Sequence, residues 1–97
     1  MGKTTTKRLE EVLTRRLHLR DPRFRLEKLS SGRISGSVIS DSFKGVSDKD
    51  RQRRIWKALA AEFGEESTNV AGTLLAYTDA EWDVDFEDVT EHNKSRR

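Results

Sequence analysis

Six basic side chains stand close together in the middle of the chain, and their type and spacing suit contact with an anionic partner. An arginine guanidinium is planar and donates two hydrogen bonds to a single phosphate or carboxylate. In a helix, positions three and four residues apart share a face, so several of these side chains would point the same way. The candidate nucleic-acid-binding residues are therefore Lys44, Lys49, Arg51, Arg53, Arg54 and Lys57.

Other interpretations of this basic row remain open. A solvated helix face has the same composition, and so has a surface that docks an acidic protein. Arg51 lies one turn before Ile55, close to the apolar stripe, so it suits pairing with a carboxylate such as Asp41 as well as it suits ligand binding. If two predicted helices pack side by side, the basic patch would extend to Lys7, Arg8, Arg15 and Arg16.

The residues needed for enzymatic chemistry are not arranged as a catalytic site. The chain has no cysteine, which excludes disulfides, thiol catalysis and cysteine-ligated metal. Its two histidines are His18, at the end of a predicted helix, and His92, near the C-terminus. Neither stands beside a nucleophile that it would activate. We therefore expect a protein that is not an enzyme and that has no cofactor.

The charges are unevenly distributed along the 97 residues, which make one small domain because two separate cores would be too small to fold. Residues 1–57 carry 16 Lys and Arg against 7 Asp and Glu, whereas residues 58–97 carry 3 against 10. This dipolar pattern favours an anionic partner for one face, with mutual screening as the alternative. We expect a domain over 1–85 followed by a flexible charged tail over 86–97.

Membrane insertion is not expected from this composition. No window approaches the ~18 apolar residues needed to cross a bilayer. Together with the absence of cysteine, this is typical of a cytoplasmic protein, and we expect that location.

Two helices are predicted from apolar residues that recur every three or four positions. The first covers 4–19 and stops before Pro22, which has no amide proton to donate. The second begins after Ser47, whose hydroxyl can cap the first turn, and ends near Gly64. The apolar stripes consist of Leu9, Val12, Leu13 and Leu17 in the first helix and of Ile55, Leu59 and Phe63 in the second.

Alternation of apolar and polar residues predicts three strands. Residues 24–30 and 33–40 form a hairpin, because Gly32 between them suits a tight turn. Gly36 weakens the second strand or marks a bulge or a close contact. After a loop over 65–69, a third strand covers 70–77.

A capping box follows the third strand and predicts a short C-terminal helix. Thr78 and Glu81 have the required spacing of three residues, and we expect Trp82 in that helix to dock onto the sheet. The order is then helix, strand, strand, helix, strand, helix. It predicts an α+β fold with a three-stranded sheet covered on one face by helices.

Two stretches, VISDSFKGVSDKDRQRRIWKALAAEF and AYTDAEW, carry a recognisable pattern. They resemble the BolA family, whose members have a strand ending in Val-Ser-Asp, then Phe-x-Gly, an aromatic-containing helix and a strand leading to Thr-x-x-Glu-Trp. The resemblance covers residues 36–83 and implies the BolA fold, which is similar to a type II KH domain. The matching residues are Ser40, Asp41, Phe43, Gly45, Arg51, Ile55, Trp56, Leu59, Tyr77, Thr78, Glu81 and Trp82.

Two positions depart from the family pattern. BolA proteins have one histidine directly after the arginine that Arg51 matches and another in the third strand. This chain has Gln52 and Val70 at these positions. In the family these histidines are tied to a two-iron, two-sulfur cluster shared with a monothiol glutaredoxin. Glutamine is a poor iron ligand and valine is none. The resemblance therefore implies a glutaredoxin-type protein partner without histidine ligation, or a cluster held by ligands that the family does not use.

KH domains clamp nucleic acid with a Gly-x-x-Gly loop, so the similarity of the BolA fold to a KH domain raises the question of whether this chain has such a loop. Here Gly45 is followed by Val46, Ser47 and Asp48, so the second glycine is missing and an acid stands where phosphate would approach. We expect contact with DNA or RNA through the basic helix and not through such a clamp. The alternative is an adaptor that docks an acidic or glutaredoxin-type protein.

Overall fold

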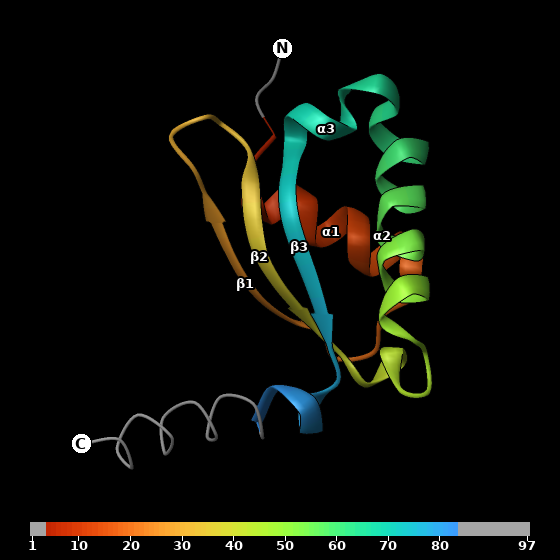
Figure 1. The fold of residues 1–97 in the computed structure, drawn as a ribbon. Helices are drawn as coiled ribbons and strands as arrows, with labels where there is room; N and C mark the ends of the chain where they lie inside the picture. Colours follow the sequence, from red (N-terminus) through yellow and green to blue (C-terminus); the bar gives the residue numbers. More distant parts are fainter. Residues whose placement is uncertain (1–3, 84–97) are drawn as a thin grey trace, which may run out of the picture.

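Strands and helices follow one another in the order that the hydrophobic pattern predicts (Figure 1). The computed structural model describes residues 4–83. Near the end of this range, residues 79–83 form a helical turn, as the capping box predicts. The elements are α1 (Thr6–Leu17), β1 (Arg23–Lys28), β2 (Ile34–Ile39), η1 (Asp41–Phe43), α2 (Asp48–Phe63), η2 (Gly64–Glu66), α3 (Ser67–Val70) and β3 (Ala71–Tyr77).

The sheet is mixed, with the strands in the order β1-β2-β3. β1 and β2 form the predicted antiparallel hairpin, whereas β3 runs parallel to β2. A parallel pair needs a crossover, and α2 supplies it. The core lies between the sheet and the two long helices, as the fold class predicts (Figure 1). It includes Leu9 and Leu13 from α1, Ile55 and Leu59 from α2, and Val38 and Leu74 from the sheet.

The limits of α2 follow from local chemistry, and they were predicted correctly. The Ser47 hydroxyl accepts a hydrogen bond from the backbone N–H of Asp50 at 3.2 Å, which satisfies one donor of the first turn. Gly64 ends the helix with a positive φ of 60°. Ile55 and Leu59 are fully buried, while Phe63 and Trp56 are half-buried against the core.

The connection from α2 to β3 differs from the prediction. Residues 65–69 were expected to form a loop, but η2 and the short helix α3 occupy this part of the chain. Ser67 and Val70 are buried, and the backbone N–H of Ala71 donates to the carbonyl of Ser67. Packing against the core therefore overrides the weak helix preference of the Ser-Thr-Asn sequence.

Parts of the expected organisation lie outside the described residues. These are the domain boundary at residue 85, the tail 86–97 and His92. Among residues 4–83, no helix combines the length and the apolar composition that a membrane span requires.

Gly36 is the position in β2 where only glycine fits. Its φ is +147°, and a Cβ placed there would lie 1.9 Å from the backbone oxygen of Arg25 in β1. The register between β2 and β3 also shifts between Ile34 and Gly36. The predicted bulge or close contact is confirmed, since both features are present.

We expect Gly36→Ala to destabilise the domain by on the order of 3 kcal/mol, because the new methyl group would clash with β1 and strain the backbone. Thermal unfolding followed by circular dichroism measures this effect. The control is Gly32→Ala in the hairpin turn, where φ is +95° but no atom lies within 4 Å of the added Cβ. Equal losses in the two variants would mean that backbone strain alone, and not the contact with β1, makes glycine necessary.

Candidate nucleic-acid interface

Arg51 differs from the other five residues of the basic row because its side chain lies inside the protein, 5% exposed. Its Nε donates to the carbonyl of Val46 at 2.7 Å, and its Nη1 donates to the carbonyl of Ala76 at 3.1 Å. Two guanidinium nitrogens also donate to the two carboxylate oxygens of Glu81, at 2.6 and 3.0 Å. Arg51 is therefore not part of an exposed contact surface, although the sequence placed it there.

The carboxylate partner of Arg51 also differs from the one expected. Asp41 instead accepts a hydrogen bond from the backbone N–H of Asp79 at 3.1 Å. Glu81 is held by the predicted capping box, in which it accepts from the N–H of Thr78 and its own N–H donates to the Thr78 hydroxyl. The hydrogen bonds from Arg51 and then from Thr78 lower the pKa of Glu81 from 4.5 to about 2.

Gln52, which stands where the BolA pattern has histidine, has a structural role. Its Nε2 donates to the carbonyl of Leu74 at 2.6 Å. Arg51 donates to the carbonyl of Ala76 in the same strand. Two side chains of α2 thus bond to backbone carbonyls on the edge of β3 that is not paired with β2. Unpaired edge groups are a template for strand addition, and these two bonds protect that edge. No local pattern around Gln52 predicts this role.

The remaining basic residues of the row are exposed, as the sequence predicts for a contact surface: Lys44, Lys49, Arg53, Arg54 and Lys57. Arg53 pairs with Asp50 at 3.3 Å, and both side chains are more than half exposed. For Arg54 and Lys57, no ion pair or side-chain hydrogen bond occurs within residues 4–83. Their charges are therefore not neutralised by a neighbouring acid in that range.

Three arginines of α1 converge on one carboxylate of α2. Glu62 is 3.4 Å from Arg15, 2.8 Å from Arg16 and 2.9 Å from Arg8. The hydrogen bond from Arg16, the largest cause, lowers the pKa of the Glu62 carboxyl. Because three cations share one anion, this cluster itself carries a net positive charge.

α1 and α2 are in contact, as the predicted extension of the basic patch requires. In Figure 1, α1 crosses behind β3 toward α2. Arg16 and Leu17 of α1 line the same cavity as Arg54 and Lys57 of α2. We use the name basic surface for the exposed cations on these helices and in the turn before α2, namely Lys7, Arg8, Arg15, Arg16, Lys44, Lys49, Arg53, Arg54 and Lys57.

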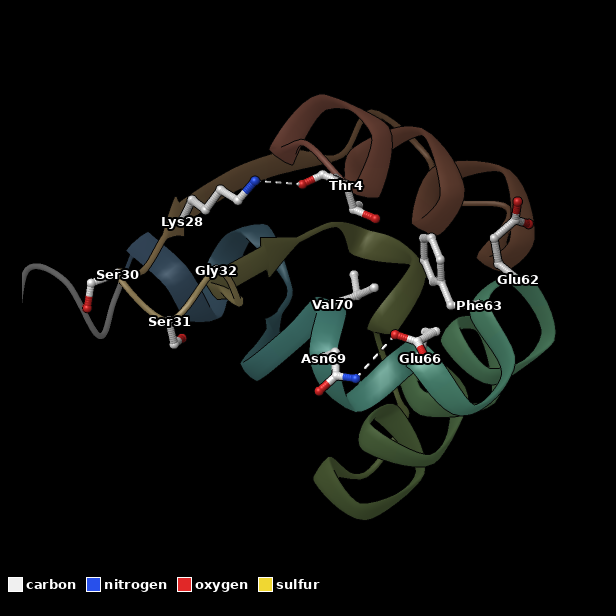
Figure 2. Close-up of a pocket in the computed structure, with 10 residues that line it drawn as sticks. All are labelled: Thr4, Lys28, Ser30, Ser31, Gly32, Glu62, Phe63, Glu66, Asn69 and Val70. Atoms are coloured by element: carbon white, nitrogen blue, oxygen red, sulfur yellow. Dashed lines mark hydrogen bonds between the residues drawn. The ribbon is translucent and has the colours of Figure 1, made fainter. Parts of the chain in front are cut away.

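A separate cleft of about 660 Å³ lies between the hairpin turn and the end of α2 (Figure 2). Lys28 donates to the carbonyl of Thr4 at 3.2 Å, and Asn69 donates to Glu66 at 3.2 Å. Phe63 and Val70 form its apolar part. The cleft mixes both charges with hydroxyl groups, and no group of three or more potential metal-ligating side chains occurs among residues 4–83. It does not contribute to the basic surface.

Comparison with known proteins identifies the fold. No family model matches the chain, and no curated protein matches it. Among solved structures, a Bol-like protein from Babesia bovis is 24% identical, with a TM-score of 0.62 over 87% of this chain and 95% of that one. The chain has the BolA fold. BolA1 from Arabidopsis thaliana is 17% identical, with a TM-score of 0.61 over 82% of this chain and 98% of that one.

A third structure with the BolA fold is a single domain of a larger protein. The BolA domain of SufE1 from Arabidopsis thaliana is 22% identical and has a TM-score of 0.58. The match covers 80% of this chain and 98% of that domain. The resemblance found in the sequence is thereby confirmed for the fold.

The Arg51–Glu81 pair gives a prediction about acid stability. Since the folded pKa of Glu81 lies near 2, below its ordinary value of 4.5, the carboxylate stabilises the fold above about pH 4.5. That stabilisation is lost as the pH falls from about 4.5 to about 2. Glu81→Gln should cost about 2 kcal/mol near neutral pH, the value of a hydrogen bond between charged groups at a partly exposed carboxylate.

The measurement is the melting temperature of both proteins as a function of pH. The difference between them should shrink as the pH falls through that window, because the wild-type protein then loses the same charge. Glu65→Gln is the control, since it removes a charge from an exposed side chain that makes no ion pair within residues 4–83. A difference that stays constant down to about pH 2 would contradict the assigned role of the carboxylate.

Proposed function

We propose that this chain is a non-enzymatic binding module that contacts DNA or RNA through the basic surface. The observation that carries the proposal is the pair Arg54 and Lys57, which are exposed and have no acidic partner within residues 4–83. Arg16 lines the same cavity from the neighbouring helix. Cations from two elements are thus presented side by side, which suits a polyanion better than it suits a single small anion.

The acidic groups near α2 further define where the contact would lie. Asp48 and Asp50 stand in its first turn, and Asp50 pairs with Arg53. A phosphate approaching that end of the helix would meet both signs of charge. The contact is therefore centred on Arg54 and Lys57 and on the adjoining part of α1, with Lys44, Lys49 and Arg53 at its margin.

The non-enzymatic part of the proposal rests on the roles of the titratable groups. Among residues 4–83, the groups with a clearly shifted pKa are Arg51, Glu62 and Glu81. Each of them belongs to an ion pair that joins elements of the fold. Ion pairs that stabilise the fold explain these pKa shifts, and the shifts do not indicate a catalytic acid or base.

A protein adaptor is the second candidate function, and one observation favours it. Leu75 is 45% exposed on β3, and its alternation with buried Leu74 and Ala76 places it on the face of the sheet away from the helices. A domain of this fold also forms part of a larger protein in SufE1. A glutaredoxin-type partner, suggested by the family resemblance, would then bind without histidine ligation at Gln52.

The test of the proposed function is the double variant Arg54→Glu/Lys57→Glu. Binding of a fluorescent oligonucleotide is measured by anisotropy over a range of salt concentrations. The slope of log K against log salt should fall by about 0.7 for each contact with a single-strand phosphate that is lost, and affinity at low salt should fall with it.

The matched control is Arg25→Glu/Arg33→Glu, which changes the net charge equally at exposed residues of the hairpin. It should bind almost as well as the wild-type protein. If both double variants lose affinity to the same extent, overall charge and not the basic surface governs binding. Saturable binding of a protein partner with little dependence on salt, in the absence of oligonucleotide binding, would support the adaptor function instead.

A further inference from the structure

The cavity between α1 and α2 has two kinds of surface. It has a volume of about 360 Å³ and is lined by Arg16 and Leu17 of α1 and by Arg54, Lys57, Ala58 and Ala61 of α2. Leu17, Ala58 and Ala61 supply its apolar part, and the other three side chains supply cations from both helices. The cavity exists because the two alanines are small. Larger residues there would fill the space between the helices.

One of the cations is fixed in position before any ligand binds. The Nε of Arg16 donates to Glu62 at 2.8 Å, and Glu62 is itself only 14% exposed and held by Arg8 and Arg15. This bond uses one of the five N–H groups of the guanidinium. The other N–H groups make no hydrogen bond or ion pair within residues 4–83, and the Arg16 side chain lines the cavity. A planar guanidinium next to an apolar surface is a suitable platform for a flat aromatic ring.

This combination of an apolar cavity and flanking cations favours single-stranded nucleic acid over other anionic partners. In a duplex the bases are paired and stacked, so a duplex would present only its phosphates to this surface. A single strand presents both a base for the apolar part and phosphates for the cations that flank it. An acidic amphipathic helix would need apolar anchors along two turns. Only Leu17, Ala58 and Ala61 are apolar here, and they surround one compact cavity.

Resting on the proposed function, we propose that the ligand is single-stranded nucleic acid and that one unpaired base enters the cavity between α1 and α2. Arg54 and Lys57 hold the neighbouring phosphates. The base stacks against the apolar side chains and the Arg16 guanidinium. The proposal adds selectivity for single strands to a surface whose charges alone would not distinguish a single strand from a duplex.

Ala61→Leu tests the cavity without changing any charge. Ala61 is exposed and helical, and leucine is a good helix former, so the variant should fold normally. The wild-type protein should bind a mixed-sequence single strand more tightly than the duplex of the same sequence and length at equal salt. Filling the cavity should weaken binding of the single strand at least about fivefold, the lower limit of what stacking of one base contributes. Duplex binding and the salt slope should not change.

The control is Ala60→Leu, the same substitution at the exposed neighbouring position, which lies outside the cavity lining. An abasic oligonucleotide gives a second control, since its binding should be weak and insensitive to Ala61→Leu. Equal binding of single strand and duplex, or an Ala61→Leu variant that binds like wild type, overturns the inference. If Arg54→Glu/Lys57→Glu still abolishes binding in that case, the proposed function stands without it.

Two other outcomes would also be decisive. An absence of binding to both oligonucleotides at low salt would overturn the proposed function together with this inference. If poly-glutamate displaces the single strand at a lower charge concentration than the duplex does, the cavity accepts acidic peptides. The inference would then be wrong.

Discussion

The buried guanidinium of Arg51 is the interaction on which the arrangement of this domain depends. A buried charge is costly unless its hydrogen-bonding groups are matched, and here one side chain meets a carboxylate and two backbone carbonyls. These partners belong to the turn before α2, to β3 and to the helical turn at 79–83. The guanidinium also lies over the ring of Phe43 in η1, 5.8 Å from its centre. One anchor thus ties the start of α2 and the turn before it to residues 76–81, which lie 25 to 30 residues further along the chain.

The same anchor sets the orientation of the basic surface. Arg51 and Gln52 bond to the edge of β3, and Ile55 and Leu59 on the same side of α2 are buried in the core. The other side of the helix must then face outward, and it carries Arg53, Arg54 and Lys57. The exposure of the candidate contact residues is therefore a consequence of the internal bonds, and the arginines of one helix divide into an internal and an external group.

Features that depend on neighbouring residues could be predicted from the sequence. The Ser47 cap, the apolar stripe of α2 and the box formed by Thr78 and Glu81 each follow from spacings of three or four residues. The short helix α3 could not be predicted, because the burial of Ser67 and Val70 depends on the rest of the core. The burial of Arg51 was indicated by the sequence, because this residue lies one turn before Ile55 on the inward side of α2. Its partner lies 30 residues away, and spacing alone did not identify it.

The assembly of the basic surface was likewise beyond local patterns. The sequence shows arginines at positions 8, 15 and 16, but only the packing of α1 against α2 brings them to Glu62. At the two positions that depart from the BolA pattern, the side chains make contacts within the fold. The amide of Gln52 is committed to a backbone carbonyl, and Val70 is buried in the core, so both positions serve the fold. Neither side chain carries the imidazole nitrogen that histidine supplies at these positions in the family pattern.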